Sequence, residues 1–416
     1  MKHIAVVGAG IAGLSAAWLL SRRHAVHLFE RDARLGGHTN TVVAQTPDGP
    51  VPLDTGFLVH NDRTYPNLVR LFRELGVDTR DSDMSFAVSC RRTGLEYSSR
   101  GLNGFFANRR AFLSPSHLRL FRDIVRFNRE APSLLTMPGA EAITLAEFLD
   151  ARRFPEEFVE RYLLPMAAAI WSASPSAIRA FPALTLVRFF DNHGLLTLNG
   201  HPTWKVVAHG SHTYVPLLTA PLADRVHLRA APTGIARDAD GVTLTFADRE
   251  PRRFDEVVLA CHGDQVLPLL RQPTAAEADV FRAFTTSPNT AWLHTDVSVL
   301  PAHERAWASW NYLLAPDPAA RPTVTYDLNR LQGLTTRERY LVTLNPSVPI
   351  EEGRVIGRFS YAHPLYTRDA IRAQARWAEV SGVNRIHYCG AYWGHGFHED
   401  GFVSAIRVAR TLGVTW

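Results

Sequence analysis

The chain opens with MKHIAVVGAGIAGLSAAWLL (residues 1–20), a stretch that admits two opposite interpretations. It carries no charge after Lys2, which is typical of a signal peptide or a membrane span. It also contains three glycines, Gly8, Gly10 and Gly13, in the spacing G-x-G-x-x-G between a strand-like run and a helix-like run. The choice between the two interpretations decides whether we expect an exported protein or a dinucleotide-binding one.

A phosphate-binding strand–turn–helix accounts for all three glycines: one makes the tight turn, one lets the backbone approach the pyrophosphate, and one lets the helix pack on the strand. Glu30 ends the strand-like run VHLFE about 20 positions further on, where a carboxylate accepts ribose hydroxyls. In a signal-peptide helix each glycine would be unfavourable by about 1 kcal/mol. The following SRRH (21–24) is no cleavage site. The sequence therefore favours a dinucleotide-binding turn.

Composition predicts a large protein of the reduced cytoplasm. The 416 residues, 46% of them apolar, can form two or three folding units. The three cysteines, Cys90, Cys261 and Cys389, lie far apart without a C-x-x-C motif, which predicts neither disulfides nor a metal site. No later apolar run approaches 18 residues, so we expect no membrane span.

The pattern along the chain predicts a discontinuous nucleotide-binding domain. Because a lone βαβ unit cannot bury both faces of a parallel sheet, VVLA (257–260) and the terminal strand–helix (386–412) are expected to complete it. The turn DADG (238–241) predicts a hairpin between VHLRA and GVTLTF. We assign 1–60, 205–275 and 376–416 to this nucleotide-binding domain. The substrate domain then has a helical part, 61–204, and an antiparallel-sheet part, 276–375.

The last thirty residues distinguish FAD from NAD. In CGAYWGHGFHEDGFVSAIRVARTLG (389–413), Gly390 ends a strand, and a glycine-rich turn leads into a helix expected to begin near Phe402, with Asp400 as a candidate N-cap. The positive N-terminal end of a helix stabilises an anionic reduced isoalloxazine by about 0.3–2 kcal/mol. Because a nicotinamide gains nothing from such an arrangement, the segment favours FAD.

With these motifs in order, GAGIAG, Glu30, RLGG, DTGF, VVLAC and GFHEDGF, the sequence resembles the FAD-dependent amine oxidase and phytoene desaturase superfamily over nearly its whole length. LHTD (293–296), SWNY (309–312) and YAHPLY (361–366) further resemble a subgroup of bacterial FAD-binding oxidoreductases associated with cyclopropane and furan fatty acid methyltransferases. The resemblance implies an α/β fold: a Rossmann-like FAD-binding domain of the amine-oxidase type, with an inserted α+β substrate domain containing an antiparallel sheet.

The resemblance also implies roles for individual residues. Gly37 and His38 would lie along the diphosphate and ribityl chain, Arg34 could reach the pyrophosphate, and Phe402 and Val403 would donate N–H groups to the ring. Pro232 stands where relatives clamp the adenine with an N–H that proline lacks. The complete predicted cofactor site is Gly8, Ala9, Gly10, Ala12, Gly13, Glu30, Arg31, Arg34, Gly36, Gly37, His38, Thr55, Gly56, Phe57, Pro232, Ala260, Gly390, Asp400, Phe402 and Val403.

The expected chemistry is transfer of a hydride from carbon to flavin N5, with a proton leaving the neighbouring carbon to a base. His395, His398 and Glu399, beside the presumed ring, are the candidate catalytic residues, and each can equally be structural. The resemblance favours desaturation or oxidation of a methyl-branched unsaturated fatty acyl chain. An amine or carotenoid-type oxidase, and a non-catalytic flavin-binding partner of a lipid methyltransferase, stay open as alternatives.

Residues 91–129 contain nine arginines against Glu96 and Asp123. Within HLRLFRDIVRFNRE (117–130) the arginines are expected on one helical stripe, and Leu118, Phe121, Ile124 and Val125 on another. Such a helix is either a peripheral contact with the inner face of a membrane or the solvated face of a core helix. Without a recognition motif, the charge does not indicate nucleic-acid binding.

Overall fold

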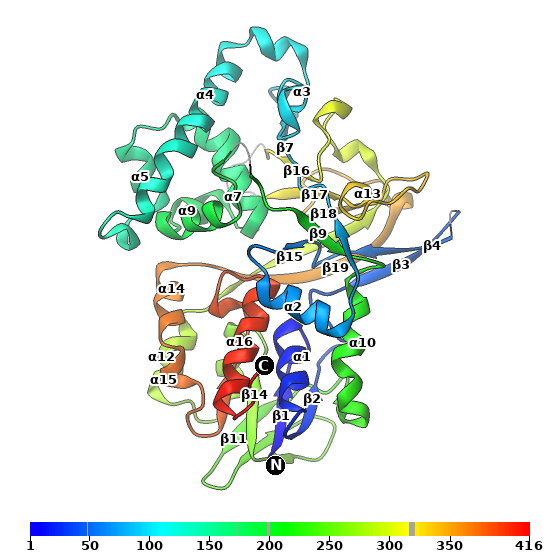
Figure 1. Cartoon of the computed structure of the whole chain (residues 1–416), viewed down its shortest axis with the longest axis vertical. Coiled ribbons are helices and arrows are strands. Elements are labelled where there is room, and N and C mark those ends of the chain that lie inside the picture. The colour runs from blue at the N-terminus through cyan, green and yellow to red at the C-terminus, as the bar shows by residue number, and fades with distance from the viewer. Residues whose placement is uncertain (48, 172, 198–199, 316–320) are drawn as a thin grey trace.

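A parallel sheet forms the lower half of the molecule in Figure 1. The computed structural model describes residues 1–416 except 48, 172, 198–199 and 316–320. The order of the five strands is β10-β2-β1-β14-β20, and every neighbouring pair is parallel. Their bounds are β1 His3–Val7, β2 Ala25–Phe29, β10 Val226–His227, β14 Glu256–Leu259 and β20 Ile386–Tyr388. The expected completion of the sheet by 257–260 and by the terminal strand is confirmed.

Helices cover this sheet because their apolar faces need burial. The contact between α1 (Ile11–Leu20) and α16 (His398–Thr411) joins the two ends of the chain, and α1 is buried along its whole length. A Cβ on Gly401 would lie 2.7 Å from Ile11 Cγ2, so only glycine lets these helices approach so closely. The other helices of this half are α2 Pro66–Leu75, α10 Tyr214–Thr219, α11 Val266–Leu269, α12 Ala275–Arg282, α14 Arg368–Ala375 and α15 Trp377–Val380.

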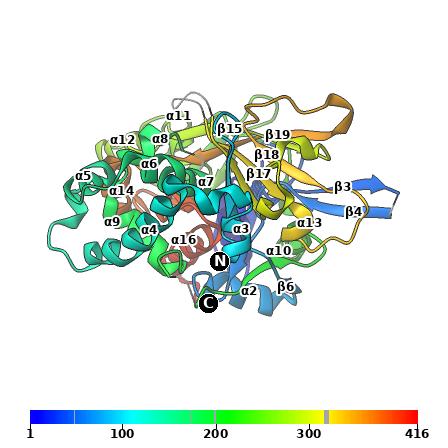
Figure 2. The same ribbon diagram turned by 90° about the horizontal axis from the view of Figure 1, so that it is seen from above.

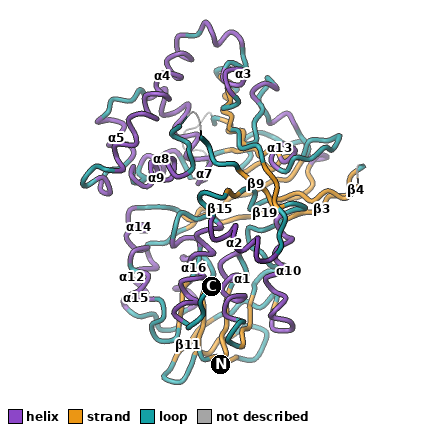
Figure 3. Tube along the Cα trace, viewed as in Figure 1, coloured by secondary structure: helices purple, strands orange, loops and turns teal. Residues whose placement is uncertain are grey.

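The upper half combines a seven-stranded sheet with a group of helices, which Figure 3 separates by colour. The strand order is β19-β15-β18-β17-β16-β7-β8. All neighbours are antiparallel except β16 and β7. The bounds are β7 Phe86–Cys90, β8 Leu95–Ser98, β15 Thr286–His294, β16 Trp310–Leu313, β17 Thr323–Asp327, β18 Leu341–Leu344 and β19 Val355–Pro364. Its helices include α3 Gly101–Phe105, α4 Pro115–Glu130, α5 Leu145–Ala151, α6 Glu156–Phe158, α7 Leu164–Trp171, α8 Pro175–Arg179, α9 Ala183–Asn192 and α13 Leu328–Leu331.

Short strands link the halves. The pair β3 (Thr41–Thr46) and β4 (Gly49–Asp54) projects to one side, opposite α5, when the molecule is seen from above (Figure 2). A second small sheet joins β5 (His60–Asn61), β9 (Trp204–Val207) and β6 (Thr79–Asp81). Among the described residues, no helix is both long and apolar enough to cross a membrane.

Two expectations about the fold need correction. The segment 61–204 is mostly helical, as expected, but β7 and β8 extend the upper sheet, and α2 packs into the core of the nucleotide-binding half through Leu71. The DADG turn joins β12 (Val242–Thr245) to β11 (Gly234–Arg237), and β13 (Arg252–Phe254) completes that sheet. The segment expected to be its partner instead contributes β10 to the parallel sheet, because Val226 pairs with Leu28.

The orientation of α4 also differs from the expected one. Its buried face consists of His117, Leu120, Asp123, Ile124 and Phe127. Three of the four residues expected on one apolar stripe are therefore exposed, namely Leu118, Phe121 and Val125. Both faces of this helix carry apolar residues, so the periodicity alone did not show which face is buried.

Candidate cofactor and substrate site

In the turn between β1 and α1, each glycine has the role that the motif predicts. Gly8 has φ +102°, and a Cβ there would lie 2.9 Å from the Ala260 carbonyl oxygen. A Cβ on Gly13 would lie 1.8 Å from the Gly8 oxygen, so helix and strand meet at van der Waals distance only without side chains. A Cβ on Gly10 would meet nothing within 4 Å. Open space therefore faces Gly10, the position at which the pyrophosphate must approach the backbone.

The first turn of α1 offers unpaired donors to that space. Gly10 is the N-cap and provides no side-chain acceptor, and no acidic residue lies in the first turn. The glycine doublet folds onto the same corner, because Gly36 N donates to Ala9 O at 2.8 Å and a Cβ on Gly37 would lie 3.1 Å from Gly10 Cα. The corner thus combines backbone donors, the positive end of a helix and room for an anion.

Glu30 follows β2 and lies beside this turn. Its Oε2 accepts from Ala9 N at 2.7 Å and its Oε1 from Asp32 N at 2.9 Å. A carboxylate has about four lone-pair sites, so two are left for ribose hydroxyls. The buried Pro232 lies in the segment that runs alongside, where Ala230 N donates to Glu30 O at 2.8 Å.

The guanidinium of Arg34, which the sequence suggested for the pyrophosphate, bonds to its own loop. It donates to Gly37 O at 2.7 Å and to Thr39 O and Leu35 O at 3.3 Å each, so it fixes the shape of that loop. Arg31 is exposed and lies 3.5 Å from Asp32 Oδ1. The loop that Arg34 fixes is the one that presents Gly37 and His38.

His38 and the segment 54–57 line the next part of the site. Phe57 N donates to His38 O at 2.7 Å, and a Cβ on Gly56 would lie 2.2 Å from the same oxygen. Thr55 Oγ1 lies 2.7 Å from the Tyr361 hydroxyl, on whose ring His38 stacks at 4.9 Å between centroids. Burial and the neighbouring His363 lower the pKa of His38, which keeps it neutral. Its Nε2 is buried without a hydrogen-bond partner among the described residues.

These features pass a direct test of whether the chain can hold a dinucleotide. A buried, unpaired ring nitrogen is unfavourable by about 1–3 kcal/mol unless something bonds to it. The unpaired His38 Nε2, the space at Gly10 and the free donors of α1 lie along the route expected for the diphosphate and ribityl chain. The residues present therefore fit a bound dinucleotide.

The helix at the end of the chain begins earlier than expected. α16 starts at His398, and Asp400 is not its N-cap but lies in its first turn, where Oδ2 accepts from Phe397 N at 2.9 Å. The N–H groups of Phe402 and Val403 fall in the second turn, where they are bonded within the helix and are not free donors. The N–H groups of His398 and Glu399, in the first turn, have no partner within the helix.

The structure separates the three catalytic candidates. His398 is buried, its ring stacked on Phe57 at 3.6 Å, and its Nε2 lies 3.0 Å from Thr39 Oγ1 and 3.1 Å from the Tyr214 hydroxyl. Burial lowers the pKa of His398 to about 3, which makes it a weak base. This hydroxyl network holds the helix start in place.

Glu399 caps another helix. Its carboxylate accepts from Asn67 N at 3.1 Å, Asn67 Nδ2 at 2.6 Å and Leu68 N at 2.8 Å, at the N-terminus of α2. Burial raises the pKa of Glu399, and these three donors oppose the rise. The contacts give Glu399 a structural role.

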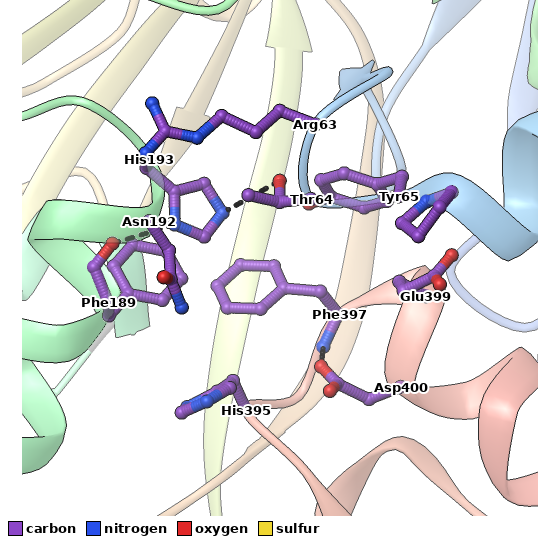
Figure 4. A pocket seen from close by; sticks show the side chains of 11 residues that line it. Arg63, Thr64, Tyr65, Phe189, Asn192, His193, His395, Phe397, Glu399 and Asp400 are labelled. Atoms are coloured by element: carbon purple, nitrogen blue, oxygen red, sulfur yellow. Dashed lines mark hydrogen bonds between the residues drawn. The ribbon is translucent and has the colours of Figure 1, made fainter.

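His395 lies in the wall of a pocket of about 380 Å³. Figure 4 shows three walls: the loop before α2, the end of α9, and the turn before α16. Phe397 points across the pocket and stacks with Phe189 at 5.2 Å between centroids. On the opposite wall, His193 is held by Phe189 O at 2.8 Å and Thr64 Oγ1 at 3.2 Å, and burial lowers its pKa to about 4.

The sequence did not predict several members of this site. Tyr361 and His363 lie two positions apart on β19, so the alternation in YAHPLY could have placed both on one face. Tyr214 and His193 come from a short helix and a helix end without any motif, and only the tertiary fold brings them here. Ala260 and Gly390, both predicted, lie at the ends of β14 and β20; Gly390 N donates to Ser404 Oγ of α16 at 2.8 Å.

Residues 11–336 match the sequence model of the flavin containing amine oxidoreductases. The chain is 29% identical over 331 residues to a carotenoid phi-ring synthase of Streptomyces griseus, covering 73% of this chain and 61% of that one. It is 25% identical over 265 residues to bovine (Bos taurus) flavin-containing amine oxidase A, covering 60% of this chain and 47% of that one. The chain thus spans about half to three-fifths of the length of these relatives.

Three solved structures share the fold across nearly their entire length. A putrescine oxidase mutant has a TM-score of 0.72 at 16% identity and covers 98% of both chains. Cyclohexylamine oxidase from Brevibacterium oxydans has 0.70 at 16%, covering 99% of both. A fatty acid isomerase from P. acnes that produces CLA has 0.66 at 15%, covering 98% of both.

Proposed function

The chain belongs to the flavin-containing amine oxidoreductase family, and on this premise we propose that it is an FAD-dependent oxidoreductase acting on a fatty acyl chain with an anionic end. FAD, when bound, supplies a two-electron acceptor for a hydride leaving carbon. The chain's part is to hold that cofactor, orient the substrate, and remove a proton from the neighbouring carbon, so that a C=C bond forms.

The cofactor would be held by contacts from both ends of the sequence. The donors around Gly10 would bind the pyrophosphate, the remaining lone pairs of Glu30 the ribose, and His38 Nε2 an oxygen between them. The free N–H groups at the start of α16 would stabilise negative charge on the reduced ring.

The charges of the pocket carry the proposal for the substrate. Both acids in its walls are already engaged: Glu399 by three donors of α2, and Asp400 by Phe397 N. Arg63, in contrast, forms no ion pair among the described residues, and its guanidinium donates one long bond, 3.4 Å to Asp191 O. A carboxylate or phosphate is thus matched by Arg63, which has no acidic partner among the described residues, whereas an ammonium group would have to share a carboxylate that already accepts hydrogen bonds.

Phe189, Phe397 and Tyr65 supply the apolar part of the same pocket, which suits an acyl chain extending from the anionic end. His395 is the candidate base, because it borders the pocket and its ring is not enclosed in a hydrogen-bond network like that of His398. The fatty acid isomerase shares this fold, which supports an acyl substrate as one that the architecture can accept.

Two other substrates define the alternative outcomes. The similarity to a carotenoid phi-ring synthase supports a carotenoid, and the similarity to amine oxidases supports an amine. If the protein is only a flavin-binding partner of a lipid methyltransferase, none of these substrates should reduce its flavin.

The decisive experiment mixes the FAD-loaded protein anaerobically with a methyl-branched monounsaturated phospholipid, its free acid, an aliphatic amine or a carotenoid. We expect loss of flavin absorbance and a product lighter by two hydrogens only with the acyl substrates. Arg63→Gln should raise KM about tenfold or more with kcat little changed, whereas Arg73→Gln, also near α2 but outside the pocket, should not. Reduction by amines alone would overturn the proposal, and no reduction by any of them would favour the partner role.

The base is tested separately. His395→Gln should slow flavin reduction roughly 10²- to 10⁴-fold without preventing substrate binding. His193→Gln on the opposite wall is the matched control, because both ring nitrogens of His193 are already bonded. A larger loss in the His193 variant would contradict this assignment, because it would place the base at His193 and not at His395.

A further inference from the structure

One end of the molecule exposes an unusual amount of apolar surface. We define the α3–α4 tip as residues 101–129, which include α3, the 3₁₀ helix Arg109–Leu113 and most of α4. Of the 14 large hydrophobic residues found exposed in the described part of the chain, six lie in this tip: Leu102, Phe112, Leu113, Leu118, Phe121 and Val125. Soluble proteins rarely gather such residues without a binding partner. The tip lies at the top of Figure 1, at the far end from the parallel sheet.

On α4 the exposed residues form one face. Each of the positions 118, 121, 122, 125 and 129 is three or four residues from another member of the set, so they lie on the same side of the helix. That side therefore combines Leu118, Phe121 and Val125 with Arg122 and Arg129. Because the opposite face is buried in the core, this mixed face is fixed toward solvent.

The neighbouring 3₁₀ helix extends this surface. Phe112 stacks on the buried Phe106 at 4.0 Å between centroids, and Phe121 contacts the buried Phe105 edge-on at 5.3 Å. The exposed rings are thus backed by core rings and held in position. Leu113, next to Phe112, is 88% exposed and is the most prominent side chain of the tip.

The charge of the tip is almost entirely positive. It carries six arginines and a single acid, Asp123, which is buried. Arg110 and Arg129 form no ion pair among the described residues. Arg122 pairs with the buried Asp123 at 3.1 Å, and with acids outside the tip Arg119 pairs with Glu157 at 3.8 Å and Arg126 with Glu130 at 2.9 Å. The exposed apolar residues are therefore accompanied by more arginines than acids.

We propose that the α3–α4 tip docks on an anionic lipid bilayer, with Leu113 and the exposed rings entering the headgroup region while the arginines contact lipid phosphates. The protruding apolar side chains match the apolar boundary below the headgroups, and the neighbouring arginines match the anionic phosphates. A second copy of the chain would bring like charges face to face, and nucleic acid would leave the apolar side chains without a partner. This inference goes beyond the proposed function and does not depend on turnover.

The test is co-sedimentation with vesicles of phosphatidylcholine alone or with added phosphatidylglycerol, at low and high salt. We expect binding that requires the anionic lipid and weakens with salt. Because each arginine near such a surface contributes roughly a fivefold factor in partitioning, Arg110→Gln/Arg129→Gln should bind roughly 25-fold more weakly. Arg282→Gln/Arg410→Gln, which changes the same net charge in the nucleotide-binding half, should bind like wild type.

Leu113→Gln isolates the apolar contribution and should weaken binding several-fold without changing its salt dependence. Equal binding to both vesicle types, or an equal loss in both arginine pairs, would overturn the proposal. A concentration-dependent dimer that the Leu113 variant abolishes, without vesicle binding by wild type, would overturn it in favour of a second copy. Unfolding curves for each variant exclude misfolding as the cause of lost binding.

Discussion

Gly10→Ala tests whether the space beside Gly10 is needed by the cofactor alone and not by the fold. Gly10 has φ −74° and ψ −177°, which alanine adopts without strain, and its Cβ would meet no atom within 4 Å. We therefore expect the free energy of unfolding of the apoprotein to change by less than about 1 kcal/mol. The small gain from a stiffer unfolded chain offsets the slightly poorer N-cap.

The same methyl group occupies the approach of the pyrophosphate to the first turn of α1. Losing two charge-assisted hydrogen bonds of about 1.5–3 kcal/mol each weakens FAD binding by roughly 10²- to 10⁴-fold. Urea unfolding of the apoprotein gives the first quantity, and quenching of flavin fluorescence on titration gives the second. Wild-type affinity in the variant would refute the assignment of this corner to the pyrophosphate.

Gly56→Ala provides the contrast. Its Cβ would lie 2.2 Å from the backbone oxygen of His38, so the substitution should lower the stability of the apoprotein itself by several kcal/mol. If Gly10→Ala and Gly56→Ala destabilised the apoprotein equally, then the space beside Gly10 would be needed by the fold itself and not only by the cofactor.

Three further predictions concern buried charges. Glu277→Gln should lower the free energy of unfolding, measured in urea, by about 3 kcal/mol, because Arg237 loses the buried carboxylate that it contacts at 2.6 Å. A loss below about 1 kcal/mol would contradict this expectation. Burial raises the pKa of Asp54 from 3.8 to about 6, so the folded state favours the protonated carboxyl group. As the pH rises from about 4 through 6, the free energy of unfolding of wild type should therefore fall by up to about 3 kcal/mol relative to that of Asp54→Asn. Parallel Tm-against-pH profiles for those two proteins would exclude this effect. Glu399→Gln should destabilise the protein by about 1–3 kcal/mol by removing the anion at the start of α2, and an unchanged urea midpoint would argue against that capping role.

The sequence could predict the parts of the site that depend on local geometry. The three glycines of the first turn and Glu30 have only one arrangement compatible with their spacing, and the structure has them in that arrangement. The completion of the parallel sheet followed from the need to bury both of its faces.

The parts that failed depend on contacts between distant segments. Asp400 and Gly401 were interpreted as signals for a helix start, but Gly401 is there to let α16 touch Ile11, and Asp400 bonds back to Phe397. The bonds of Arg34 to its own loop depend on a backbone conformation that the sequence spacing does not reveal. β7 joins the upper sheet through a parallel pair with β16, more than 200 residues away, and no local signal anticipates that pairing.

The contact between Gly401 and Ile11 sets an order of events during synthesis. At about 5–20 residues per second, a ribosome takes roughly 20–80 s to add the residues that separate α1 from α16. Over that interval the face of α1 that contacts α16 has no final partner, and the donors at the start of α16 do not yet exist. Flavin capture is therefore a late event, and a nascent chain stalled before residue 398 should bind chaperones rather than cofactor.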